Sequence, residues 1–162
     1  MKMLLILRHA KSSWKDSSLA DHDRPLNRRG EVDAPRMGEW ARRHDLLPEL
    51  ILASTARRAR QTVTGFIDGS GYVGDVRYTR DLYAAGPEAY LEVLAAAPDG
   101  IERVMVVGHN PGLEELLTDL TGEDERLPTA ALAQVDLDLD SWSEVIDGAE
   151  GKLAGLWRPK EL

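Results

Sequence analysis

The fold is decided by two stretches, Leu4-Leu5-Ile6-Leu7-Arg8-His9 and Val104-Met105-Val106-Val107-Gly108-His109. In each, a continuous run of apolar residues leads into a histidine, and such a run is typical of a strand that is buried on both faces of a sheet. Open α/β sheets bind their ligands just beyond the carboxyl ends of their strands. If the two strands are neighbours, the two histidines face one another across a single pocket.

Strand and helix patterns alternate along the rest of the chain. We expect strands at 3–8, 50–53, 76–78 and 103–107, helices at 28–44, 56–67, 87–96 and 112–120, and a closing antiparallel hairpin of 131–139 and 152–157 around Asp147-Gly148. This order predicts an α/β fold, a three-layer α/β/α sandwich with a mostly parallel central sheet and an antiparallel edge. Pro35 falls within the first helix, where it should kink the helix or occupy its first turn.

Composition narrows the class of protein. The chain has 162 residues, 43% of them hydrophobic, and neither a repeat nor a linker, so we expect one domain over residues 1–162. The lack of cysteine excludes disulfides, zinc thiolates and a thiol nucleophile, and a net charge of −8 argues against a nucleic-acid binder. Four apolar residues before Arg8 are too few for a signal peptide or a membrane span, so we expect a cytoplasmic protein without membrane contact. Our working expectation is a monomer, and the sequence leaves the oligomeric state open.

A long polar loop follows the first histidine, at residues 11–29. Such loops in a small domain are usually functional or disordered, and this one begins at His9, which favours a function. Trp14 within it is either a docking aromatic for a partner or an anchor of the loop. Asp21-His22-Asp23 carries metal-ligand side chains, but three adjacent residues rarely converge on one ion. We therefore expect a solvated loop and no metal.

Three motifs resemble those of the histidine phosphatase superfamily, also called the phosphoglycerate-mutase-like or Arg-His-Gly family. They are Arg8-His9-Ala10, Gly108-His109, and Ser54-Thr55-Ala56-Arg57-Arg58-Ala59-Arg60-Gln61-Thr62, which is similar to the family's Ser-x-x-x-Arg-Ala-x-Gln-Thr segment. The short chain and Arg24-Pro25-Leu26-Asn27-x-x-Gly30 are most similar to SixA-type phosphohistidine phosphatases. The resemblance implies a phosphoglycerate-mutase-like fold and a phosphatase that works through a phosphohistidine intermediate without a cofactor.

The resemblance also assigns roles to residues. His9 would be the nucleophile, because a neutral imidazole nitrogen can accept a phosphoryl group. Arg8 and Arg58 would clamp the phosphate, since the planar guanidinium matches two phosphate oxygens. His109, just before a helix, would donate to a nonbridging oxygen.

The choice of Arg58 rests on the alignment alone. Arg57 lies about 100° and Arg60 about 200° away around the same helix, so only one of the three can point inward, and Arg57 is the alternative. The resemblance further suggests phosphate or substrate contacts for three residues, Ser12, Lys15 and Asn110. At Lys15 the sequence departs from the asparagine that is usual in the family, and at Ala10 from its usual glycine.

No acid that would protonate a leaving group stands out, and Asp81 and Glu88 are weak candidates. The phosphorus–nitrogen bond of phosphohistidine is labile, whereas an alkyl phosphate ester needs a proton on its departing oxygen. We therefore expect a metal-independent phosphatase whose partner is a phosphorylated protein, such as a phosphohistidine domain. The alternatives are a phosphomonoesterase for a small phosphate ester and, less favoured, a noncatalytic phosphate-binding module.

Overall fold

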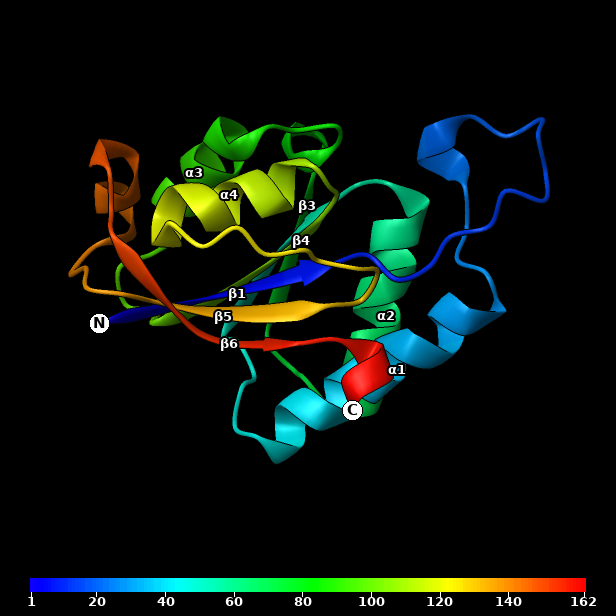
Figure 1. Cartoon of the computed structure of the whole chain (residues 1–162), viewed down its shortest axis with the longest axis horizontal. Coiled ribbons are helices and arrows are strands. Elements are labelled where there is room, and N and C mark those ends of the chain that lie inside the picture. The colour runs from blue at the N-terminus through cyan, green and yellow to red at the C-terminus, as the bar shows by residue number, and fades with distance from the viewer.

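A six-stranded sheet forms the centre of the computed structural model, which describes residues 1–162 (Figure 1). The strand order is β3-β2-β4-β1-β5-β6, with parallel pairing from β3 to β1 and antiparallel pairing of β5 with both β1 and β6. The strands are β1 (Lys2–Arg8), β2 (Leu50–Ser54), β3 (Asp75–Thr79), β4 (Arg103–Gly108), β5 (Leu132–Leu137) and β6 (Gly151–Trp157). The predicted mostly parallel sheet with an antiparallel edge is confirmed.

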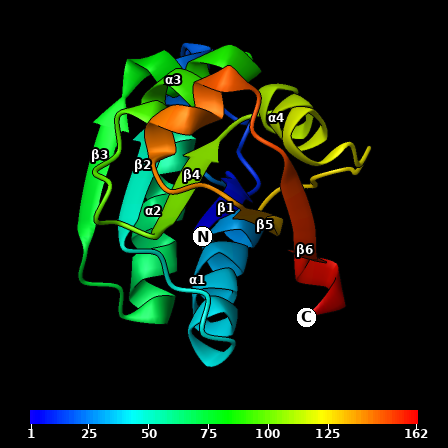
Figure 2. The same ribbon diagram turned by 90° about the vertical axis from the view of Figure 1, so that its left-hand side faces the viewer.

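Four α-helices cover the sheet. They are α1 (Arg28–Arg43), α2 (Arg57–Ser70), α3 (Pro87–Ala95) and α4 (Gly112–Thr121). Figures 1 and 2 show α3 and α4 on one face and α1 and α2 on the other, which confirms the three-layer α/β/α sandwich. Short 3₁₀ helices occur at Asp21–Asp23, Arg80–Leu82, Trp142–Asp147 and Pro159–Glu161. No helix in the structure combines the length and the apolar composition that a membrane crossing requires.

The apolar run of β1 is continuous because the strand is buried on both faces. Leu4 and Ile6 pack in the core beneath α3 and α4, whereas Leu5 and Leu7 pack in the core beneath α1 and α2. Each of the four is at most 1% exposed. Alternate side chains of a strand point to opposite faces, so a strand covered on both sides has no place for polar residues.

The register of β1 against β4 brings both histidines to the same edge of the sheet. β1 lies directly beside β4, and Arg8 pairs with Gly108, the last residue of its strand. The hydrogen bonding between the two segments continues for one residue beyond β1, since the backbone N–H of His9 donates to the carbonyl of Gly108 at 3.0 Å. The expected neighbouring strands are therefore present, and each histidine follows its strand directly.

Two local features differ from what the sequence pattern predicts. The hairpin of β5 and β6 is antiparallel as expected, but no tight turn at Asp147-Gly148 joins its strands. Instead the connection contains the 3₁₀ helix Trp142–Asp147, because Trp142 is fully buried and its indole N–H donates to the carbonyl of Ile101 at 2.7 Å. Pro35 lies well inside α1 rather than in its first turn.

Helices α1 and α2 pack backbone to backbone. A Cβ atom added at Gly38 would collide with the carbonyl oxygen of Phe66, and one added at Gly69 would collide with the carbonyl oxygen of Pro35. The two helices thus approach so closely that only glycine fits at these crossings.

We expect Gly38→Ala to lower the free energy of unfolding by about 1–3 kcal/mol, as overpacking of a tight core does. Alanine has the higher helix propensity, so without the contact to Phe66 the same change would stabilise α1. Urea unfolding of the two proteins measures the difference. Gly100→Ala is the matched control, because a Cβ atom there meets open space; equal stabilities of all three proteins would contradict the predicted crossing.

Candidate active site

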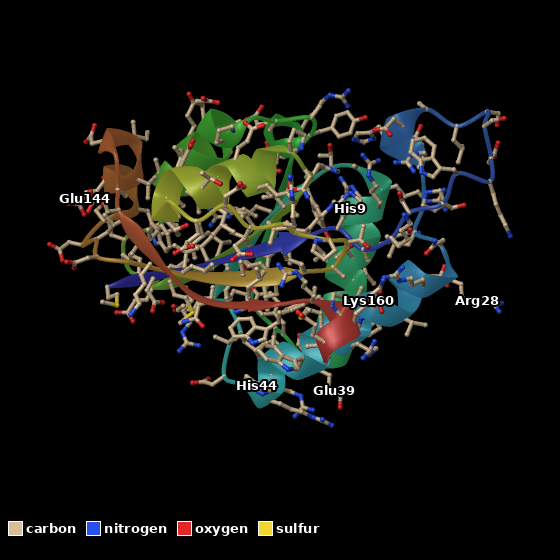
Figure 3. The ribbon with its side chains drawn as sticks, in the orientation of Figure 1. His9, Arg28, Glu39, His44, Glu144 and Lys160 are labelled. Carbon is tan, nitrogen blue, oxygen red and sulfur yellow. The ribbon has the colours of Figure 1, made fainter.

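Two buried histidines form the centre of the site. His9 follows β1, His109 follows β4, and each is 7% exposed. Their ring centroids lie 5.1 Å apart, with the planes tilted by 50°. Figure 3 shows His9 just beyond the end of β1, close to the beginning of α2. The two rings are near enough for both to contact one small ligand.

The hydrogen bond of His9 fixes which nitrogen is free. Its Nδ1 atom lies 2.7 Å from the carbonyl oxygen of Ala10, which can only accept, so Nδ1 carries the proton. The lone pair is then on Nε2. Burial lowers the pKa of His9 to about 3, and the charges of Arg58 and Arg8 act in the same direction. At neutral pH the ring is a neutral base with a defined tautomer.

His109 has the same protonation pattern for a different reason. Its Nε2 atom lies 2.8 Å from the hydroxyl of the fully buried Ser54, which also accepts from the backbone N–H of Ala56 at 3.1 Å. If the Ser54 hydroxyl donates to Nε2, its hydrogen has a buried acceptor and the proton of His109 lies on Nδ1, which has no partner within the chain. Burial, then the charge of Arg58, lowers the pKa of His109 to about 4. His109 thus offers an N–H donor where His9 offers a lone pair.

Two buried or half-buried arginines, Arg8 and Arg58, carry charges that lower the pKa of both histidines. Arg8 donates from Nη1 to the carbonyl of Leu127 at 3.0 Å. Arg58 is 6% exposed and donates from both Nη atoms to Asp21, at 2.7 and 3.0 Å. Its neighbours Arg57 and Arg60 are exposed on the other sides of α2.

Most of the buried polar atoms that lack a hydrogen-bond partner belong to residues of this site. Five buried side-chain nitrogen or oxygen atoms in the chain have no hydrogen-bond partner within it, and four of them belong to Arg8, Arg58, His109 and Asn110. Three of these four are donors, namely Nε of both arginines and Nδ1 of His109. A buried donor without a partner costs about 1–3 kcal/mol. These donors, together with the lone pair of His9, form a site that can bind a buried anion.

The segment at residues 21–23 is solvated as expected, since the Asp21 and Asp23 side chains are 49% and 64% exposed, but Asp21 also has specific partners. The Asp21 carboxylate accepts from the Tyr83 hydroxyl at 2.6 Å, from Arg58 at 3.0 Å and from Arg24 at 3.1 Å. These bonds, that of Tyr83 first, hold the pKa of Asp21 well below its usual range. His22 is also engaged, with Nε2 lying 2.8 Å from the Thr55 hydroxyl. The physical reason is the buried guanidinium of Arg58, which needs a counter-charge.

The Gln-Thr end of the Arg-Ala-x-Gln-Thr segment holds the loop in place. Gln61 accepts from the backbone N–H of Leu26 at 2.7 Å. Thr62 accepts from the backbone N–H of Ala10 at 2.9 Å and donates to the carbonyl of Arg58 at 2.7 Å. These side chains tie both ends of the loop to α2, and so fix the backbone that follows His9.

A second close contact fixes the approach to His109. The Tyr90 hydroxyl accepts from the backbone N–H of His109 at 3.1 Å, and a Cβ atom added at Gly108 would collide with that hydroxyl. Only glycine lets Tyr90 reach the end of β4.

The three predicted contact residues have different positions. Ser12 is buried and accepts from Arg24 at 2.8 Å, so it supports the loop. Asn110 lines the cavity beside His109, and its amide donates to the carbonyl of Leu127 at 2.8 Å. Lys15 is exposed and lines neither cavity that adjoins the site residues, because the loop carries it outward.

The cavity at His109 has a volume of about 440 Å³ and two carboxylates in its lining, Asp21 and Glu115. Asp81 and Glu88 line other hollows, so neither sequence candidate for an acid reaches this cavity. Glu115 is absent from the sequence prediction, although its place in the first turn of α4 after His109 is a usable signal. No group of three or more His, Asp or Glu side chains is arranged to hold a metal ion.

Known proteins are similar to this chain in sequence and in fold. A family model of the histidine phosphatase superfamily (branch 1) matches residues 4–83. An uncharacterized chloroplastic protein of Arabidopsis thaliana is 36% identical over 171 residues, covering 98% of this chain and 78% of that protein. A candidate phosphohistidine phosphatase SixA from Agrobacterium tumefaciens superposes with a TM-score of 0.84 at 32% identity, covering 98% of each chain. The protein histidine phosphatase SixA complexed with tungstate superposes with a TM-score of 0.81 at 25% identity, covering 98% of this chain and 97% of that one.

We expect the imidazoles of His9 and His109 to stay neutral and Nδ1-protonated at pH 5.5. An unperturbed histidine, with a pKa of about 6.5, would be roughly nine-tenths protonated at that pH, whereas burial lowers both pKa values to about 3 and 4. Two-dimensional ¹⁵N–¹H spectra of the rings report both the charge and the tautomer. Ser54→Ala should alter the tautomer of His109 and leave that of His9 unchanged; a protonated His9 ring at pH 5.5 would contradict the assignment.

Proposed function

The chain belongs to the histidine phosphatase superfamily and is a phosphatase, and we propose that its substrate is phosphohistidine in a protein partner. One observation carries the reaction chemistry: three buried donors have no partner within the chain, and they belong to Arg8, Arg58 and His109, the side chains that act electrostatically on the neutral ring of His9. A phosphoryl group supplies the oxygens that these donors lack. The relative that is complexed with tungstate binds a tetrahedral oxyanion of the same shape.

The reaction proceeds in two displacements at phosphorus. Nε2 of His9 attacks, forming a new phosphorus–nitrogen bond as the bond to the leaving group breaks. The Nε–H groups of the two arginines and the Nδ1–H of His109 donate to the nonbridging oxygens, where charge gathers in the transition state. Water then attacks the phosphorus of phosphorylated His9, releasing inorganic phosphate and restoring the neutral imidazole.

Proton supply favours a nitrogen leaving group. A phosphohistidine whose other ring nitrogen is protonated departs as neutral imidazole, so the enzyme need not donate a proton. An alkyl phosphate needs a general acid. Here the nearest carboxylate, Asp21, is kept ionised by Tyr83, Arg58 and Arg24, and Glu115 is exposed at the rim of the cavity.

Exposed Trp14 supports a protein as the carrier of the phosphoryl group. The ring is 72% exposed, and the guanidinium of Arg24 lies 3.5 Å from its centroid. Arg24 in turn contacts Asp21 and Ser12, which connects the exposed ring to the site. Tryptophan is enriched among the residues that dominate binding energy in protein interfaces. We therefore favour the docking role for Trp14.

His9→Ala should lower the turnover of a phosphohistidine protein domain by more than about 1,000-fold, because the covalent step is lost. Release of inorganic phosphate is measured in the presence of a chelator. His44→Ala is the matched control, since His44 is exposed at the far end of α1 (Figure 3). Undiminished turnover by His9→Ala would refute the nucleophile, and loss of wild-type activity in the chelator would refute a metal-independent reaction.

Glu115→Gln should change phosphohistidine turnover by less than about threefold, whereas loss of a working general acid costs about 10²- to 10⁴-fold. The same two proteins are compared on alkyl phosphates. Efficient wild-type hydrolysis of alkyl phosphates that collapses in Glu115→Gln would establish Glu115 as an acid. The substrate would then be a small phosphate ester rather than a phosphoprotein.

A further inference from the structure

A second cavity adjoins Arg8 and carries a strong positive charge. It has a volume of about 530 Å³, and six of its nine lining residues are charged, the others being Pro128, Thr129 and Pro159. We call it the cationic groove, and its charged lining residues are Arg8, Lys11, Arg29, Arg158, Lys160 and one acid, Glu161. They come from the end of β1, the loop after His9, the beginning of α1 and the C-terminal 3₁₀ helix, on which Figure 3 shows Lys160.

The positive charge of the groove is only partly balanced. Arg29 lies 3.5 Å from the Asp33 carboxylate, and Arg158 lies 3.4 Å from Glu125 and 3.6 Å from Glu161. The other three cations, Arg8, Lys11 and Lys160, form no ion pair within the chain, and both lysines are exposed.

The rest of the protein is acidic, with a net charge of −8. The basic groove therefore attracts an acidic partner, whereas the acidic remainder of the surface repels that partner from other orientations.

We propose that the cationic groove binds carboxylate side chains on the protein that carries the phosphoryl group. This inference rests on the proposed function and names the surface chemistry of the partner. Arg8 lies at both places, since it lines the groove and its Nε atom is one of the unpartnered donors of the site. Carboxylates that flank the phosphohistidine would therefore reach the groove while the phosphoryl group lies at His9.

The side chains of the groove favour carboxylates over a second phosphate. Bidentate phosphate binding uses the free fork of an arginine. In the groove Arg29 and Arg158 already lie within 3.6 Å of carboxylates, and Arg8 is assigned to the phosphoryl group at His9, which leaves Lys11 and Lys160 as the free cations. Lysine is a flexible point charge that adapts to the irregular spacing of acidic side chains on a protein surface. An apolar partner surface is disfavoured, because six of the nine residues that line the groove carry a charge.

The groove is tested directly with a hexaglutamate peptide titrated into the ¹⁵N-labelled protein. We expect saturable shifts of the backbone amides of Lys11, Thr129 and Lys160. The double variant Lys11→Glu/Lys160→Glu should weaken binding by about tenfold or more, since two attractive charges become repulsive. The control Lys152→Glu places one new acid on β6, outside the groove, and should weaken binding by less than about twofold.

Three outcomes of the titration would overturn the proposal. The first is the absence of saturable shifts at the groove, and the second is equal weakening by the double variant and by the control Lys152→Glu. The third is displacement of the peptide by pyrophosphate at a concentration below that at which the peptide itself saturates the shifts. The last outcome would identify a small-anion subsite instead.

A turnover assay separates this inference from the proposed function. With a phosphohistidine domain that bears acidic residues next to its histidine, kcat/KM should fall steeply with added salt, and less steeply in the double variant. If the wild type does not hydrolyse this domain, the proposed function fails, while the peptide titration still decides whether the groove binds carboxylates. If the domain is hydrolysed with the same salt dependence by both proteins, the groove does not contact it and the inference fails alone.

Discussion

Parallel pairing of β1 with β4 is the constraint on which the rest of the site depends. The pairing of Arg8 with Gly108 ends both strands at one level, so that each histidine leaves the sheet beside the other. A shift of one residue would turn every side chain of β1 to the opposite face, and Leu4 to Leu7 are all buried, so the register is set by two hydrophobic cores at once. The distance of 5.1 Å between the imidazoles is therefore a product of core packing.

Burial then keeps the imidazoles of both histidines uncharged at neutral pH. Removal of water disfavours the charged form of both rings, and two neighbouring guanidinium groups reinforce that effect. The tautomer of each ring is determined by the oxygen atom that it contacts. For His9 this is the backbone carbonyl of Ala10, and for His109 it is the Ser54 hydroxyl. One ring therefore presents a lone pair and the other an N–H group, although the two are chemically identical side chains. The difference lies in which fixed oxygen each ring meets.

The sequence predicts the parts of this arrangement that depend on local pattern. Strands buried on both faces are continuous apolar runs, and so β1 and β4 are visible without a structure. Asp21 and Ser54 were not predicted as participants, because each reaches the site through a partner that is distant in the chain. Asp21, for example, pairs with Arg58 across 37 positions, and no spacing rule connects a loop acid to a helix on another segment. The connection before β6 was misjudged for the same reason, since the burial of Trp142 depends on a carbonyl that lies 41 positions away.

The contact between Gly108 and Tyr90 has a consequence for how this sequence can diverge. The Tyr90 hydroxyl occupies the volume that any side chain at position 108 would need, while it also accepts the N–H of His109. A larger residue at 108 is therefore tolerable only if position 90 changes first, to a residue that lacks the hydroxyl. That intermediate would leave the His109 amide without its buried acceptor. Gly108 is thus held by the Tyr90 hydroxyl, and that hydroxyl is in turn held by the amide of His109, so neither position can change without a loss of stability.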